Sequence, residues 1–210
     1  MKNNVISRTY IKLITLAIAF IFSSASYAQS TSADSINPSI YLNGVANHLL
    51  EDIKANQKKL VNDTRLAEKL VRTNLLPAID SHGFAKRTIG KKAWVSASDE
   101  QKTRFVNAFI QLVINSYAKG LALYEGQTFV FSDPKMSKSG KTAVVRSSMD
   151  QPGSTPIVID YKLSNKTGSW KIIDLTIEGV SMIKSYKSQF APNLAKLGLE
   201  KFIVDLETKS

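Results

Sequence analysis

The sequence predicts an α+β domain in which helices pack on a curved, four-stranded antiparallel sheet. Apolar residues recur at helical spacing from Pro38 to about Leu121, alternate with polar residues from Thr128 to Ile177, and return to helical spacing after Ser181. The strands are short and joined by turn residues, so we expect an antiparallel meander between two helical parts. The 210 residues include no cysteine, which excludes disulfide scaffolds and thiolate chemistry.

The N-terminal segment has the three-part layout of a secretory signal peptide. Basic residues precede the apolar run Leu13–Phe22, and the small residues Ser26 and Ala28 then occupy the two positions that a signal peptidase recognises. The apolar run is far shorter than the ~20 residues that a membrane-spanning helix needs. We therefore expect residues 1–28 to be removed after about Ala28, leaving one exported domain over residues 29–210.

Residues 37–97 predict a helical part of this domain. Asn37-Pro38 is typical of a helix start, and Pro77 is expected to kink or end a second amphipathic helix. A short helical piece is expected over 84–89. Residues 98–210 then form the second part, which opens with a capping box, Ser98 followed three residues later by Gln101. The helix after it, to about Leu121, is apolar over a wide arc and should be buried on more than one side.

Four strands follow, at 128–131, 142–149, 156–163 and 170–177, and the last two are joined by an Asn165–Gly168 turn. Strict alternation places Asp160 opposite the apolar face but Asp174 on the face of Trp170 and Ile172. A carboxylate pair for acid–base catalysis is therefore not expected.

Two closing helices complete the predicted elements. The first runs from Ser181 to about Leu194 and is interrupted by Pro192, and the second runs from Leu199 to about Thr208.

Motifs that carry catalysis are few. Ser181 and Lys184 match an S-x-x-K motif, but the accompanying Lys-Thr-Gly at 166–168 precedes the serine instead of following it. A turn at 166–168 and a helix cap at Ser181 explain both. His48 and His82 are the two histidines of the chain, and we expect a structural role for each. The sequence therefore predicts neither an enzyme nor a metal site.

The formal net charge of +11 indicates an anionic partner. Ten basic residues and three acidic ones lie between Lys54 and Lys92. This stretch is either a docking surface or a solvated set of helix faces, and the sequence leaves both open. Because export makes nucleic acid an improbable partner, we expect lipid headgroups or acidic proteins.

Apolar and aromatic side chains on the expected inner faces exceed what a small core needs. Phe105, Phe109, Phe129, Tyr161 and Trp170 are examples. They could fill a solid core or line a pocket between the sheet and the long helix, and composition does not choose between these.

The C-terminal segment resembles a known family. Residues 178–191, Glu-Gly-Val-Ser-Met-Ile-Lys-Ser-Tyr-Lys-Ser-Gln-Phe-Ala, are similar to the signature of the MlaC or toluene-tolerance family. The likeness continues through Leu197-Gly-Leu199 to Leu206, and landmarks upstream include Leu75-Leu-Pro77 and Tyr124-Glu-Gly-Gln127. One departure is the basic link Gly90–Trp94, where relatives often have a more neutral one.

This resemblance implies a periplasmic phospholipid carrier of the Mla pathway, which maintains the lipid asymmetry of the outer membrane. It implies a nuclear-transport-factor-2-like core, an apolar cavity for acyl chains and no catalysed reaction. No cofactor is implied, since the bound phospholipid is cargo. The implied partners are the outer-membrane MlaA complex and an inner-membrane ABC transporter, reached through MlaD. The alternative is an exported adaptor with a solid core that binds a membrane or protein through a basic face.

Under the carrier hypothesis, the apolar inner-face residues should contact lipid. They are Phe105, Phe109, Leu112, Tyr117, Phe129, Phe131, Val144, Ile157, Ile159, Tyr161, Leu163, Trp170, Ile172, Val180 and Met182.

Overall fold

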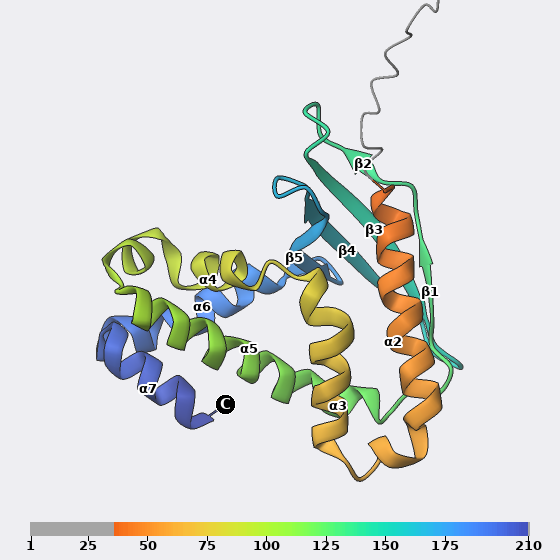
Figure 1. Ribbon diagram of the computed structural model, residues 1–210, viewed down its shortest axis with the longest axis horizontal. Coiled ribbons are helices and arrows are strands. Elements are labelled where there is room, and N and C mark those ends of the chain that lie inside the picture. The colour runs from red at the N-terminus through yellow and green to blue at the C-terminus, as the bar shows by residue number, and fades with distance from the viewer. Residues whose placement is uncertain (1–35, 210) are drawn as a thin grey trace, which may run out of the picture. The chain divides into compact units, whose positions relative to one another are not determined.

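The computed structural model describes residues 36–209 (Figure 1). The predicted signal peptide lies outside the described residues. Helices precede and follow an open antiparallel sheet, which confirms the predicted α+β class. The helical segments are α2 (Pro38–Leu60), α3 (Thr64–Leu70), a π-helical turn η1 (Val71–Leu75), a 3-10 turn η2 (Leu76–Ala78), α4 (Ser81–Ser96), α5 (Asp99–Leu121), α6 (Met182–Leu197) and α7 (Leu199–Lys209).

The helix starts follow the predicted capping chemistry. The Asn37 side chain accepts a hydrogen bond from the Ser39 N–H at 2.8 Å. Ser98 and Gln101 form a reciprocal capping box, in which each side chain accepts from the other's backbone N–H at 3.0–3.1 Å. The Ser181 hydroxyl accepts from the Lys184 N–H at 3.2 Å, so the serine of the S-x-x-K motif is a helix cap.

Two helices differ from the sequence prediction in extent. α4 is longer than the expected piece at 84–89, and Gly90, with φ of 83°, breaks it into two helical stretches. α6 contains Pro192 but continues past it to Leu197.

The sheet contains the four predicted strands, β1 (Thr128–Phe131), β3 (Thr142–Asp150), β4 (Ile157–Ser164) and β5 (Lys171–Ile177), paired in that order as an antiparallel meander. Two short strands were not predicted, β2 (Lys135–Met136) beside β3 and β6 (Val180–Ser181) beside β5. The predicted turn between β4 and β5 is present, with the Gly168 N–H donating to the Asn165 carbonyl at 3.4 Å.

A β-bulge in β5 corrects the predicted position of Asp174. Leu163 pairs with Ile172, but Lys162 pairs with Asp174, so the register shifts by one residue. Asp174 therefore lies on the opposite face from Ile172, and Leu175 and Ile177 take the inner positions opposite Tyr161 and Ile159. Asp174 accepts hydrogen bonds from the Ser181 hydroxyl (2.8 Å) and the Ile183 N–H (3.4 Å), which joins β5 to the start of α6.

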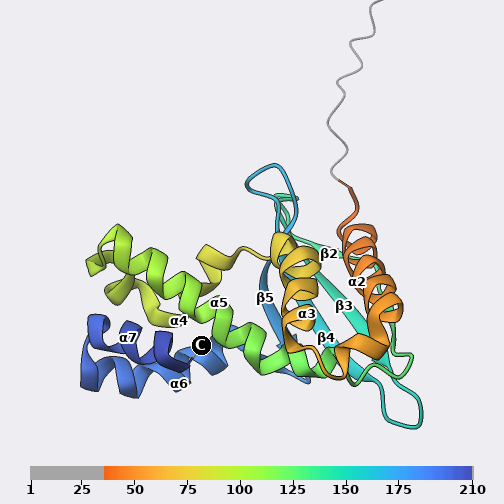
Figure 2. The ribbon, with the colours of Figure 1, turned by 60° about the horizontal axis from the view of Figure 1, so that its bottom comes forward.

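Helix α2 lies across the inner face of the sheet, while α4, α5, α6 and α7 gather beside the β5 edge, as Figures 1 and 2 show. The start of α2 is joined to the sheet by Trp170, whose indole N–H donates to the Ile36 carbonyl at 2.7 Å. The main hydrophobic cluster contains side chains from α5, α6, α7 and the sheet, and a second joins α2, α3 and the end of α5. α5 belongs to both clusters, which confirms that it is buried on more than one side.

Candidate functional site

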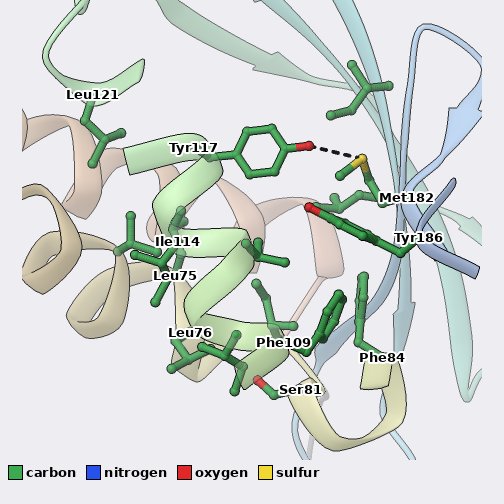
Figure 3. Close-up of a pocket in the computed structure, with 16 residues that line it drawn as sticks. Leu75, Leu76, Ser81, Phe84, Phe109, Ile114, Tyr117, Leu121, Met182 and Tyr186 are labelled. Carbon is green, nitrogen blue, oxygen red and sulfur yellow. Dashed lines mark hydrogen bonds between the residues drawn. The ribbon is translucent and has the colours of Figure 1, made fainter. Parts of the chain in front are cut away.

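An apolar cavity of about 240 Å³, which we call the helix pocket, lies between α5, the η1–η2 segment, α6 and β5 (Figure 3). Among its lining residues, Ser81, Tyr117 and Tyr186 carry side-chain polar atoms. The others are Val71, Leu75, Leu76, Ile79, Phe84, Phe109, Ile110, Val113, Ile114, Leu121, Leu175, Ile177 and Met182.

A second apolar cavity of about 200 Å³, the sheet pocket, lies between α2 and the inner face of the sheet. Along α2, apolar side chains at helical spacing line one wall: Leu42, Val45, Ala46 and Leu49. The opposite wall is formed by inner-face side chains of the strands: Phe129, Phe131, Ile159, Tyr161, Ile172, Leu175 and Ile177. Burial raises the pKa of the Tyr161 phenol, so this hydroxyl stays uncharged at neutral pH.

The two pockets share a wall. Leu75, Ile79, Leu175 and Ile177 line both cavities, so the η1–η2 segment and β5 separate two neighbouring apolar spaces. The wall is held in place by the backbone, because Ile79 forms a β-bridge with Ile172 and the next N–H, of Asp80, donates to the Ile172 carbonyl at 3.0 Å. Pro77, which the sequence predicts to kink or end the helix, lies within the 3-10 turn η2. The helical segment ends one residue later, at Ala78, and the chain then runs beside β5.

At the rim of the helix pocket, Tyr117 extends from α5 toward α6 (Figure 3). Its side chain is half exposed, and its hydroxyl contacts the Met182 sulfur at 3.8 Å. Tyr186 lies below this contact, and burial, with a smaller contribution from Tyr117, raises the pKa of its phenol well above the ordinary value. Both apolar spaces therefore contain neutral side chains at physiological pH.

Groups that could support chemistry are not gathered at these pockets. Within residues 36–209, no cluster of three or more His, Asp or Glu side chains is placed to hold a metal ion. His48 is exposed, and His82 packs edge-on against the Trp94 ring at 4.7 Å. Asp160 is paired with Arg146 through two hydrogen bonds of 2.7 and 2.9 Å on the outer face of the sheet. In the same described part of the chain, no helix has the length and apolar character needed to cross a bilayer.

Eight of the fifteen residues predicted to contact lipid line one of the two pockets. The helix pocket includes Phe109, Tyr117 and Met182. The sheet pocket includes Phe129, Phe131, Ile159, Tyr161 and Ile172.

The other seven predicted residues line neither pocket. Phe105, Leu163 and Trp170 are buried in the main cluster, and Leu112 packs against it. Ile157 pairs with Met149 at the far end of the strand pair. Val180 is 57 % exposed in β6. The prediction that Val144 lies on the inner face is wrong, because Val144 pairs with Lys162 on the outer face and is 38 % exposed.

Most of the residues that the helices contribute to the two pockets were not predicted from the sequence. The apolar residues of α2 occur at helical spacing in the sequence, for example Leu42, Val45 and Leu49. No feature of the sequence indicates which face of the sheet this apolar side of the helix covers. Leu175 and Ile177 were not among the predicted residues, because strict alternation from Ile172 puts them on the outer face and does not anticipate the bulge. Leu75 and Ile79 line both pockets because of the π-helical turn and Pro77, whose joint effect is not predicted by helical spacing.

Comparisons with known proteins agree with this architecture. The model of the "MlaC protein" family matches residues 43–208. The intermembrane phospholipid transport system binding protein MlaC of Haemophilus influenzae is 28 % identical over 174 residues, which cover 81 % of each chain. The toluene tolerance protein ttg2D of Pseudomonas putida is 26 % identical over 161 residues, 77 % of this chain and 74 % of the relative.

Among solved structures, the phospholipid-binding protein of Ralstonia solanacearum, in complex with a phospholipid, superimposes with a TM-score of 0.75. The match covers 83 % of this chain and 96 % of that one at 24 % identity, so it shows that the fold is shared.

Proposed function

Because the chain belongs to the MlaC family, we propose that it is a periplasmic carrier that binds phospholipid and transports it between membranes. The single observation that carries this proposal is the pair of apolar pockets with a shared wall. They offer neighbouring spaces to the acyl chains of one lipid. The curated relatives named for intermembrane phospholipid transport and toluene tolerance support the same conclusion.

The energetics of transport explain why such a protein needs cavities and no catalytic group. Transferring an acyl chain of about 16 carbons into water costs roughly 12 kcal/mol, at ~0.8 kcal/mol per CH₂. A soluble carrier therefore has to cover the chains with apolar side chains. The carrier role requires no covalent step, and we propose that the protein is not an enzyme.

The proposed route runs between two membrane assemblies. In this scheme the protein exchanges lipid with the outer-membrane MlaA complex and with the MlaD subunit of the inner-membrane ABC transporter. Family membership supports this finer proposal, and so does the basic surplus of the chain, because a net positive charge speeds encounters with anionic surfaces. The alternative, an adaptor with a solid core, is disfavoured by the two apolar pockets.

The direct experiment is mass spectrometry of organic extracts from protein purified from the periplasm. We expect about one diacyl phospholipid per chain, and the delipidated protein should take up phospholipid again from vesicles. Folded, delipidated protein that takes up no phospholipid would contradict the proposal.

A matched pair of variants tests where the lipid lies. Ile159 lines the sheet pocket, whereas its neighbour Val158 lies on the outer face and is 37 % exposed. A carboxylate at position 159 would be buried beside an acyl chain without a partner, so Ile159→Glu should lower the bound lipid at least about tenfold and destabilise the fold by roughly 1–3 kcal/mol. Val158→Glu should change neither value. If folded Ile159→Glu keeps a normal lipid content, the inner face of the sheet does not belong to the binding site.

A further inference from the structure

A third cavity, of about 550 Å³, has a different chemical character from the two apolar pockets. This basic pocket lies between the start of α4, the β4–β5 turn and the strands that flank this turn. Its charged side chains are Arg87, Lys166 and Lys171 against one carboxylate, that of Asp80. The cations therefore outnumber the carboxylates by three to one.

Asp80 neutralises only part of this charge. One carboxylate oxygen caps α4 by accepting from the Gly83 N–H at 2.9 Å, and the other lies 3.6 Å from the Arg87 guanidinium. Lys171 donates to the Pro77 carbonyl at 2.6 Å, which is a neutral partner. Lys166 has no hydrogen bond or ion pair with any residue of the described chain. The pocket therefore retains positive charge that an anion could neutralise.

Arg87 also has an unused donor. Its NH2 group donates to the Ile173 carbonyl at 2.7 Å, which holds the guanidinium against β5. Its Nε is buried and makes no hydrogen bond within residues 36–209. A buried donor without a partner is costly, and an acceptor oxygen in the pocket would remove that cost.

Hydroxyl groups supply further donors. Ser81, Thr142, Ser164 and Thr167 line the same pocket, and their hydroxyls make no hydrogen bond to other described residues. An arginine held by the backbone, two lysines and several free hydroxyls suit the tetrahedral arrangement of acceptor oxygens on a phosphate group.

The basic pocket adjoins the apolar pockets. Ile79 lines all three cavities, and Ser81 lines both the helix pocket and the basic pocket. A positively charged site that could bind an anion is thus separated from two apolar spaces by one short stretch of chain. This juxtaposition matches an amphiphile that carries its negative charge next to its acyl chains.

From these observations we propose that the basic pocket binds a phosphate group, which is supplied by the headgroup of a bound phospholipid or by free phosphate. Arg87 is the central residue, and Lys166 and Lys171 complete the charge. The lipid source rests on the proposed carrier function, whereas binding of phosphate itself does not.

The first experiment titrates inorganic phosphate into the delipidated full-length protein by calorimetry, with chloride as the ionic-strength control. We expect saturable binding that Arg87→Gln weakens about tenfold, because a charge-assisted pair is lost. Lys166→Gln should also weaken it, and this variant should fold normally since the side chain is exposed. Lys86→Gln is the matched control, because Lys86 is an exposed neighbour that does not line the pocket.

Wild-type protein without saturable phosphate binding would overturn the proposal. The same holds if Lys86→Gln weakens binding as much as Arg87→Gln and Lys166→Gln.

The second experiment distinguishes the two sources of phosphate. If the headgroup occupies the pocket, lipid-loaded protein should no longer bind inorganic phosphate, and Arg87→Gln should reduce uptake of phosphatidylglycerol but not of a diacylglycerol with the same chains. If free phosphate is the ligand, loaded and delipidated proteins should bind it equally. Protein that takes up neither phosphatidylglycerol nor diacylglycerol would contradict the carrier function. It would leave the basic pocket to be tested by the phosphate titration, which does not depend on lipid uptake.

Discussion

Tyr117 combines two properties that make it the best candidate for a gate to the helix pocket. It lines the cavity yet is 50 % exposed, and its hydroxyl spans the rim to Met182. A contact between a hydroxyl and a thioether sulfur is weak, so it can break when a lipid enters or leaves.

We therefore expect Tyr117→Ala to speed the transfer of a fluorescent phospholipid out of the protein severalfold, because the ring no longer covers the rim. Tyr117→Phe should stay near the wild-type rate, since it keeps the ring and loses only the weak contact. Leu123→Ala serves as a control, because Leu123 is 72 % exposed and lines neither apolar pocket. Equal rates for Tyr117→Ala and wild type would show that lipid does not pass this side chain.

At the scale of elements, an ion-pair cluster joins α5 to α7, two helices that are distant in sequence. Arg104 on α5 donates to Glu207 through two hydrogen bonds of 2.7 and 2.8 Å, and to Glu200 at 2.6 Å, both on α7. Hydrogen bonds from Gln101 and Arg104 lower the pKa of the Glu200 carboxyl, and the hydrogen bond from Arg104 lowers that of Glu207.

The lowered pKa values give this cluster a defined pH dependence. Its contribution to the stability of the folded protein is complete above the ordinary Glu pKa of 4.5. This contribution is lost as the pH falls through the lowered pKa values that the two glutamates have in the folded state. The protection factors of the α7 amides, which correct for the slower intrinsic exchange in acid, should therefore fall as the pH is lowered. Arg104→Gln should lower these protection factors already at neutral pH. Lys102→Gln is the control, because Lys102 pairs with Asp99 inside α5. An α7 unaffected by Arg104→Gln would show that apolar packing alone docks it.

At the scale of the whole molecule, lipid should act as part of the core. The apolar pockets lie between α2 and the sheet and between α5, α6 and β5, so their contents join elements that are distant in sequence. Phospholipid at about 100 times its dissociation constant should stabilise the native state by about 2.7 kcal/mol. The melting temperature should rise by roughly 5–10 °C in thermal unfolding. Ile159→Glu should lack this rise, and an equal rise in that variant would indicate non-specific detergent-like binding.

The basic residues between Lys54 and Lys92 belong to several elements that do not all lie together. They are distributed over α2, α3, η1 and α4, and α2 and α4 lie on different sides of the ribbon in both views (Figures 1 and 2). A docking surface built from this stretch would therefore use only part of it. Arg87 belongs to the basic pocket instead of standing free on a helix face.

Local sequence patterns determined the elements of this protein and the order in which they follow one another. The capping box at Ser98 and Gln101, the Asn37 cap and the turn at 165–168 depend on contacts within a few residues, so short-range chemistry was enough to predict them. The alternation of Ile157, Ile159, Tyr161 and Leu163 correctly indicated one face of β4. These same patterns, with the C-terminal signature, were enough to identify the fold class and the family.

Only the tertiary structure decided where the cavities lie and which side chains line them. The bulge between Ile172 and Asp174 exchanges the faces of β5, and Leu75 and Ile79 line both pockets because a π-helical turn and Pro77 direct the chain past β5. A pocket is a gap among elements distant in sequence, and its lining depends on register and helix placement. Helical or strand periodicity records only that a side chain is apolar, so it cannot distinguish Phe105 in the core from Phe109 at a cavity wall.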